Sequence, residues 1–236
     1  MSDQSKRTNL LDLTPDRAAE VLRVYMEEIG APSYRATQVV RRLWVNPARS
    51  FDDMKELPAE LRSRLAERFD LPRLELAVEQ KSADGTRKFL FRLHDKEAIE
   101  TVAIPEGERM TICISSQAGC ALQCAFCATG AMGFTRNLAA HEIAGQVREL
   151  KLLDDPIRVT NIVFMGMGEP LMNWKAVDHV LTILNDPNGL GIGARHITVS
   201  TAGILPGIVA LSGRPEQFRL ALSIHAPRDH LRQELV

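Results

Sequence analysis

The sequence predicts an α/β fold in which a small helical region precedes a mostly parallel sheet. Three observations lead to this prediction. Residues 15–69 carry apolar side chains at helical spacing. Residues 74–115 contain short stretches that are rich in β-branched and other apolar residues, as strands are. From residue 139 onward, helical and strand patterns alternate, which is typical of parallel strands joined by right-handed crossovers.

The helical region is predicted to contain three helices, at residues 15–28, 33–45 and 58–69. In the first, Thr14 is a suitable N-cap, Pro15 fits the first turn, and Gly30 fits the end. Its apolar face repeats at helical spacing through Ala18, Val21, Leu22, Tyr25, Met26 and Ile29. The second helix is expected to face inward through Val39, Val40, Leu43 and Trp44. Successive helices of this length indicate a small helical domain.

The next segment changes to strand patterns, at residues 74–80, 87–93, 99–104 and 111–115. Helices predicted at 139–153, 173–185 and 205–211 then alternate with strands at 158–165, 195–200 and 218–224. Polar or glycine-rich residues follow these last strands directly, at 166–170, 200–203 and 223–226. Because the carboxyl ends of parallel strands meet at one edge, where α/β folds place their sites, these three segments predict a functional site.

The composition fits a globular protein. Of 236 residues, 45% are hydrophobic and 25% are charged, which excludes a disordered or fibrous chain. The net charge of -1 excludes a histone-like basic protein but allows a local basic patch. The sequence has no apolar run of membrane-spanning length, and its first residues lack the apolar core of a secretion signal. We therefore expect a cytoplasmic protein without a membrane partner.

The four cysteines lie close together in the sequence, at Cys113, Cys120, Cys124 and Cys127. Secreted domains spread their cysteines to join distant segments, whereas such clustering indicates metal or redox chemistry. The Cx3CxxC spacing of residues 120–127 puts three thiolates on one short loop. Structural zinc usually takes four protein ligands, and a [4Fe–4S] cluster usually takes four cysteines, so three would leave one iron open to an added ligand. The alternatives are a zinc loop completed by Cys113 and a set of buried structural cysteines.

The Cx3CxxC motif resembles the signature of the radical SAM superfamily. Together with the segments CISSQAGC at 113–120, GFTRN at 133–137, GMGEPLMN at 166–173 and SIHA at 223–226, it resembles the RlmN/Cfr family of radical SAM methyltransferases. The resemblance runs from about Leu10 to the last residue. It implies a partial (βα) barrel of radical SAM type at residues 96–236. A small helical domain with a few strands, which contributes to RNA binding, would precede it at residues 1–95. The implied activity is methylation of adenine C2 in 23S rRNA and in tRNA.

The resemblance also implies a cofactor site. Cys120, Cys124 and Cys127 would bind a [4Fe–4S] cluster, and S-adenosylmethionine would chelate the open iron through its amino and carboxylate groups. An electron donor such as flavodoxin or ferredoxin, with its reductase, would allow release of a 5′-deoxyadenosyl radical, which amino-acid side chains alone do not supply. The implied SAM-binding residues are Gly168, Glu169, Ser200, Ser223, Ile224 and His225.

Some of these roles also follow from the residues themselves. Gly166 and Gly168 would allow a close backbone approach to a cofactor, and Glu169 could accept a hydrogen bond from an ammonium group. Each residue also has an ordinary structural interpretation. The Gly-Glu-Pro segment can be a simple loop, Ser200 can cap a helix, and His225 can be a structural histidine.

Cys113 is a candidate catalytic residue. It is predicted on the more polar face of its strand, opposite Ile112 and Ile114, where a buried structural cysteine is less expected. In the family, the matching cysteine forms a transient disulfide with a second cysteine that carries the methyl group, and this disulfide releases the product. The alternative is a spare thiol.

Glu100 is the second candidate. It is expected to share its strand face with Ala98, Val102 and Ile104, an apolar setting that would raise its pKa and suit a general base. The family gives the matching glutamate the task of removing a proton from the adenine intermediate. The alternative is a glutamate held in a salt bridge, with an arginine as a possible partner.

A basic segment at residues 29–51 is a candidate RNA contact. It contains Arg35, Arg41, Arg42 and Arg49 and no acidic residue. Arg35 and Arg42 are seven residues apart and therefore share a helix face, with Tyr34 and Trp44 nearby. Such a patch could bind phosphates with salt-dependent affinity. A solvated helix face is the alternative.

Members of the family continue through further βα units, which carry a SAM-contacting asparagine and the methyl-carrying cysteine. No cysteine follows Cys127 here, and the final helical pattern at 229–236 has no stop signal. We therefore expect a C-terminally truncated sequence that does not complete methyl transfer. The alternative functions are a Cfr-like adenine-C8 methyltransferase and a non-catalytic metal-binding RNA module.

Overall fold

The computed structural model describes residues 7–236 and is built around one seven-stranded sheet. Its strands are β3 (Glu75–Lys81), β4 (Arg87–Arg92), β5 (Ala98–Glu106), β6 (Arg109–Cys113), β9 (Asn161–Phe164), β10 (Ile197–Thr201) and β11 (Arg219–Leu222). They lie in the order β11-β10-β9-β6-β5-β4-β3. β6, β9, β10 and β11 are parallel, and β5, β4 and β3 continue the sheet as antiparallel strands. The predicted α/β class is therefore confirmed.

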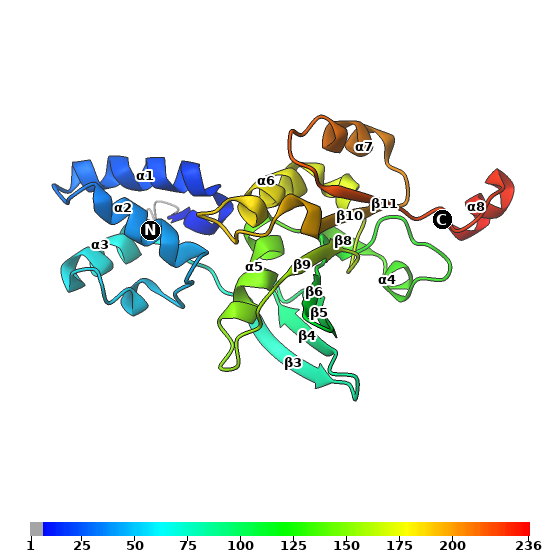
Figure 1. Ribbon diagram of the computed structural model, residues 1–236, viewed down its shortest axis with the longest axis horizontal. Helices are drawn as coiled ribbons and strands as arrows, with labels where there is room; N and C mark the ends of the chain where they lie inside the picture. The colour runs from blue at the N-terminus through cyan, green and yellow to red at the C-terminus, as the bar shows by residue number, and fades with distance from the viewer. Residues whose placement is uncertain (1–6) are drawn as a thin grey trace, which may run out of the picture.

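The helices lie around this sheet as Figure 1 shows, with α1, α2 and α3 together at one end of the molecule and α8 at the other. Their bounds are α1 (Pro15–Glu28), α2 (Tyr34–Leu43), α3 (Ala59–Arg68), α4 (Ala128–Ala131), α5 (Ala140–Lys151), α6 (Trp174–Asn185), α7 (Leu205–Ser212) and α8 (Asp229–Leu235). Two small strand pairs complete the fold: β1 (Thr8–Asn9) with β2 (Phe69–Asp70), and β7 (Gln117–Gly119) with β8 (Phe134–Asn137). Every expected helix and strand is present, whereas the β1–β2 pair, the β7–β8 pair and α4 were not predicted. Among the described residues, no helix is both long and apolar enough to cross a membrane.

The helical region packs onto the sheet through α5. The predicted inward residues Val39, Val40, Leu43 and Trp44 are all buried in a core that continues into the sheet. Arg148 of α5 donates hydrogen bonds to the carbonyl oxygens of Leu43, at 2.9 Å, and of Ala48. Burial lowers the pKa of Arg148 to about 10, so the side chain stays charged at neutral pH. A cation therefore satisfies the last carbonyl of α2, where the helix dipole favours positive charge, and the Ala48 carbonyl of the loop that follows.

The predicted boundary between residues 95 and 96 falls between β4 and β5. These strands are hydrogen-bonded neighbours, with Arg92 opposite Ala98 and Arg87 opposite Ala103. β3 and β4, expected as part of the first domain, therefore belong to the same sheet as the strands that follow.

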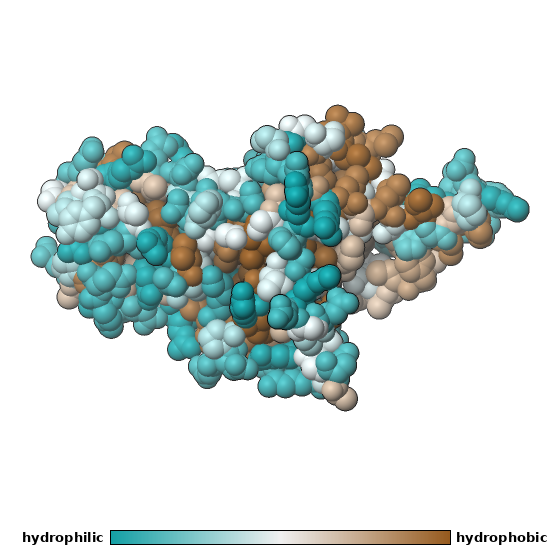
Figure 2. Space-filling view, viewed as in Figure 1, coloured by the Kyte–Doolittle hydropathy of each residue, from teal (hydrophilic) through white to brown (hydrophobic). Residues whose placement is uncertain are grey.

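The two faces of the sheet differ. Ile99, Thr101 and Ala103 of β5 point to the face that α5 covers, where Thr101 donates a 2.8 Å hydrogen bond to Gln146. The alternate residues, such as Glu100 and Val102, point to the opposite face and are only partly buried. We call this second face the open face. Apolar side chains are also exposed at the edge beside β11, where Leu205 and Val209 of α7 are 71% and 69% exposed (Figure 2).

Candidate active site

A pocket of about 370 Å³ lies where the parallel strands end. The loops after β9, β10 and β11 form one wall, and the cysteine loop between β7 and β8 forms the other. The predicted residues that line it are Cys120, Cys124, Cys127, Gly168, Glu169, Ser200, Ser223 and His225. It is also lined by residues that the sequence did not single out, among them Phe126 and Thr129. The remaining candidates, Glu100, Cys113 and Ile224, lie outside its lining.

The cysteine loop is closed at its base and compact within. The Cys120 N–H donates a 2.8 Å hydrogen bond to the Gly133 carbonyl, and the Cys127 N–H donates to the Cys124 carbonyl at 3.0 Å. Gly130 of α4 lies so close to Cys124 that an added Cβ would stand 2.9 Å from the Cys124 nitrogen. This loop therefore requires glycine at position 130.

The three motif cysteines line the same pocket and, like Cys113, are free thiols. Burial raises the pKa of Cys124, and the charges of Cys120, Cys127 and Glu169 raise it further. Within the described residues, no three His, Cys, Asp or Glu side chains stand close enough together to hold one metal ion. Three thiols that face one pocket fit a cluster that takes a single thiolate at each of three irons.

Glu169 joins two of the loops that line the pocket. It is 3% exposed, and its carboxylate accepts hydrogen bonds from the N–H groups of Leu171, at 3.0 Å, and Ala202, at 2.8 Å. Its own N–H donates to the Gln117 side chain at 2.9 Å. The predicted ligand-binding carboxylate is thus also a structural link between the loops after β9 and β10. Each of its oxygens keeps a lone pair for a further donor.

The glycines of the first loop allow close packing within the chain. A Cβ on Gly166 would lie 2.8 Å from the Ile114 carbonyl, and one on Gly168 would lie 2.5 Å from Cβ of Gln117. Gly168 also has a φ of +99°, which side-chain-bearing residues rarely adopt. The sequence predicted a close approach to a cofactor, and the structure shows a close approach to the strand ends behind the loop.

Ser200, Ser223 and His225 come together at the ends of β10 and β11. The two serine hydroxyl oxygens are 3.4 Å apart. The His225 ring lies 4.4 Å from the Phe126 ring, so the end of β11 contacts the cysteine loop. Ile224 is half exposed, and its carbonyl accepts a 3.2 Å hydrogen bond from Arg232.

Cys113 lies on the open face of the sheet, as the alternation predicts. It stands opposite Val102 of β5 and Val163 of β9, and the Met165 N–H donates a hydrogen bond toward its sulfur. Burial raises the pKa of this thiol. Ser200 follows the same alternation in β10, and Ala221 stands opposite it in β11. Cys113 and Ser200 therefore belong to one continuous surface.

The expected environment of Glu100 is wrong. Glu100 does share its face with Val102, but its side chain is 43% exposed and its carboxylate pairs with Lys88 at 3.0 Å. Lys88 lies on the neighbouring strand β4, diagonally across from Glu100. The alternative interpretation, a glutamate in a salt bridge, describes the contact, with a lysine in place of an arginine. The Glu100 backbone is tied to the pocket region, because its carbonyl accepts a 2.6 Å hydrogen bond from Ser115.

The predicted basic patch is largely paired within the chain. Arg35 and Arg42 share a helix face as expected, but both contact the segment at 51–57: Arg35 donates to the Glu56 carbonyl at 2.9 Å, and Arg42 pairs with the Glu56 carboxylate at 3.5 Å. Trp44 is fully buried. Arg49 pairs with Asp154 at 3.3 Å. These contacts hold Arg35, Arg42 and Arg49 against the chain, whereas Arg41 is exposed and has no ion pair among the described residues.

Comparison with known proteins defines the class of this protein. The family model described as the radical SAM superfamily matches residues 114–235, which span the cysteine loop and the pocket. A crystal structure of a radical SAM methyltransferase from Sphaerobacter thermophilus superimposes with a TM-score of 0.86 at 43% identity, covering 97% of this chain and 67% of that one. The chain belongs to the radical SAM superfamily.

A second family model, described as the ribosomal RNA large subunit methyltransferase N-terminal domain, matches residues 8–71. A protein of Gemmatimonas aurantiaca named as a probable dual-specificity RNA methyltransferase RlmN is 67% identical over 97% of the chain. A dual-specificity RNA methyltransferase RlmN of Magnetococcus marinus is 48% identical over 97%. Within the superfamily, the chain is a member of the RlmN family. It spans 63% and 65% of the lengths of these two relatives.

Proposed function

We propose that this chain forms the cofactor-binding part of an enzyme that methylates C2 of adenosine in 23S rRNA and in tRNA. The observation that carries the proposal is the shared pocket, in which three motif cysteines face the loops after β9, β10 and β11. The names of the relatives, which specify RNA methyltransferases of dual specificity, support it and do not favour the adenine-C8 alternative. Because its proposed substrates are rRNA and tRNA, we propose that the enzyme acts in the cytoplasm.

The residues of the pocket suit a [4Fe–4S] cluster and S-adenosylmethionine. Cys120, Cys124 and Cys127 would each hold one iron. When bound, the two groups supply one-electron chemistry, driven by a donor such as flavodoxin or ferredoxin, that amino-acid side chains do not supply. The free lone pairs of Glu169 can accept from an ammonium group, and the hydroxyls of Ser200 and Ser223 can donate to a ligand. A volume of about 370 Å³ is within the range of small-ligand sites.

Glu100 and Cys113 are proposed as the groups that act on the RNA base. Both lie on the open face of the sheet, the face that also carries Ser200. Lys88 holds the Glu100 carboxylate in place, and the half-exposed oxygens can accept a proton from a base that reaches this face. The Cys113 thiol lies on the strand next to Glu100 and can act as a nucleophile once it is deprotonated.

The test is anaerobic reconstitution of the protein with iron and sulfide. We expect about four irons per chain, as in a [4Fe–4S] cluster, and release of 5′-deoxyadenosine that depends on S-adenosylmethionine and a reductant. Cys120→Ala, Cys124→Ala and Cys127→Ala should each abolish both results. Cys113→Ala is the matched control, because it removes the fourth thiol and should leave the iron content unchanged. One tightly held zinc and no 5′-deoxyadenosine would instead favour a metal-binding RNA module and refute the proposal.

A further inference from the structure

Helix α5 holds both ends of the segment that carries the motif cysteines. Before the cysteine loop, the Gln146 side chain accepts a hydrogen bond from the Ser115 N–H and donates one to the Ser115 carbonyl, both at 2.8 Å. After the loop, the Glu142 carboxylate accepts two hydrogen bonds from Arg136, at 2.7 and 2.8 Å. Glu142 and Gln146 are 1% and 0% exposed. Four residues apart, they lie one helical turn from each other on α5.

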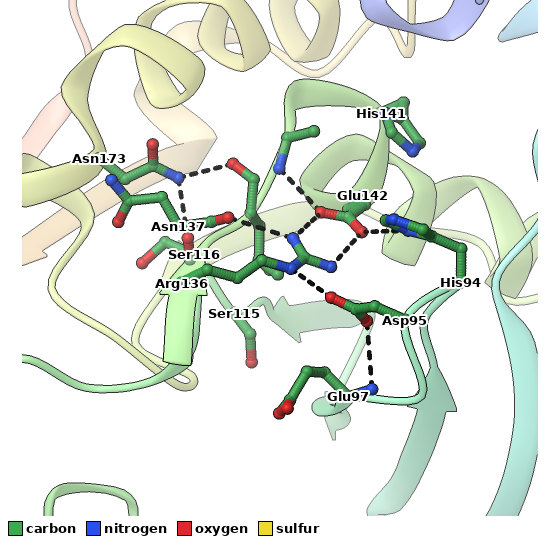
Figure 3. A network of polar contacts seen from close by, with 12 residues as sticks. His94, Asp95, Glu97, Ser115, Ser116, Arg136, Asn137, His141, Glu142 and Asn173 are labelled. Atoms are coloured by element: carbon green, nitrogen blue, oxygen red, sulfur yellow. Dashed lines mark hydrogen bonds and ion pairs between the residues drawn. The ribbon is translucent and has the colours of Figure 1, made fainter. Parts of the chain in front are cut away.

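Arg136 stands at the centre of a network of charges, which Figure 3 shows from close by. Its guanidinium bridges Glu142 and Asp95. Asp95 lies in the turn between β4 and β5, and its carboxylate accepts a 2.5 Å hydrogen bond from Arg136. Hydrogen bonds to these two carboxylates raise the pKa of Arg136 above its ordinary value. Burial opposes ionisation of Glu142, but Arg136 and the Ala139 N–H more than offset it, and the pKa of Glu142 lies below its usual range. The network is therefore ionised and fixed at neutral pH.

Arg136 is connected to the base of the cysteine loop through the pairing of β8 with β7. Arg136 belongs to β8, which pairs with β7 through Ala118 opposite Arg136. The two strands come so close that a Cβ on Gly119, where φ is +76°, would lie 2.0 Å from the Gly133 carbonyl oxygen. Cys120 is the next residue after this contact. A shift of β8 therefore changes the distance between the two ends of the loop.

We propose that Arg136 is a positioning residue that, through Glu142 and Asp95, fixes the spacing of the three motif thiols before any cofactor binds. A loop whose ends are held has fewer conformations to lose when its thiols take up a cluster. The two parallel hydrogen bonds from the Arg136 guanidinium to the Glu142 carboxylate fix the orientation of the two side chains as well as pairing their charges. A lysine at this position would keep the charge but could not make this bidentate contact, because its ammonium is a compact point charge. The inference rests on the proposed cluster site, but the order that it predicts in the loop exists without cofactor.

The first experiment measures amide hydrogen exchange of the iron-free protein, comparing residues 120–133 with α6. We expect Arg136→Lys to speed exchange in the loop about tenfold and to leave α6 unchanged. The matched control is Arg214→Lys. Arg214 also bridges two carboxylates, Asp178 at 2.6 Å and Glu216 at 2.7 Å. These contacts join α6 to the segment before β11 and do not involve the cysteine loop. This control should leave exchange in the loop at the parent rate.

The second experiment records the electron paramagnetic resonance of the reduced, reconstituted protein. Adding S-adenosylmethionine should convert the parent and the Arg214→Lys signals to one uniform species, whereas Arg136→Lys should give a mixture. Unchanged exchange and an unchanged signal in Arg136→Lys would refute the positioning role. If that variant does not fold, Asp95→Asn removes only the outer contact and should loosen the same loop to a smaller extent. A parent protein that binds no cluster would contradict the proposed function, and the exchange comparison would still decide the role of Arg136.

Discussion

Glu169 offers a sharp test of how the pocket is held together. Its buried carboxylate accepts from two backbone N–H groups, at 2.8 and 3.0 Å, that belong to different loops. In Glu169→Gln, the amide oxygen can accept from only one of them, and the amide nitrogen faces the other donor. A hydrogen bond to a charged group contributes about 1.5–3 kcal/mol, and an unsatisfied buried donor costs about 1–3 kcal/mol. We therefore expect the free energy of unfolding to fall by roughly 2–4 kcal/mol.

The assay is urea unfolding, followed by thermal unfolding. For a chain of this size, such a loss lowers the Tm by roughly 4–16 °C. Glu216→Gln is the control, because it removes a carboxylate from a partly exposed ion pair with Arg214 and should cost less than about 1 kcal/mol. If Glu169→Gln is as stable as Glu216→Gln, the carboxylate does not link the two loops and the reasoning fails.

Three further predictions follow from other contacts. The ionised Glu142 carboxylate makes its full contribution to stability at pH values above its ordinary pKa of 4.5. This contribution is lost as the pH falls through the lower pKa that Glu142 has in the folded protein. The stability difference between the parent and Glu142→Gln should therefore shrink in acid, and a difference that urea unfolding finds constant down to about pH 3 would contradict the assignment. Gly168→Ala combines a positive φ with a contact of 2.5 Å and should lose more than about 2 kcal/mol, whereas Gly191→Ala, with φ of +69° and open space around it, should lose about 1 kcal/mol. Because Glu56 occupies Arg35 and Arg42, the double variant Arg35→Ala/Arg42→Ala should bind RNA with the salt dependence of the parent in fluorescence anisotropy. A salt slope smaller by about two would restore these arginines as phosphate contacts.

The main helices and strands could be predicted because their signals are local. The helical spacing of apolar residues in α1 identifies a buried face without any knowledge of the partner. In β9, the apolar residues Ile162 and Phe164 are buried in the same way. The same alternation correctly put Cys113 on the face opposite Ile112. The ends of the parallel strands brought most of the candidate site residues into one pocket, as the topology implied.

The predictions that failed depend on contacts between distant segments. The β7–β8 pair is short and mostly polar, and Arg136 is held by residues of α5 and of the β4–β5 turn. The setting of Glu100 was missed because Lys88 comes from a neighbouring strand, although a lysine at that register was a visible signal. Arg35 and Arg42 of α2 share a face as expected, but Glu56, which contacts both, lies just after the segment that suggested the patch.

The alternation along β5 and β6 separates two kinds of constraint. Ile99, Thr101 and Ile112 point toward the covered face, where they determine whether the chain folds. Glu100 and Cys113 occupy the intervening positions on the open face, where substitution changes reactivity and disturbs the core little. Single substitutions on the open face can therefore change the chemistry of the site, while the residues on the covered face keep the fold stable. A deletion of one residue in either strand would turn the following side chains to the opposite face, and would therefore disrupt both the core and the reactive positions.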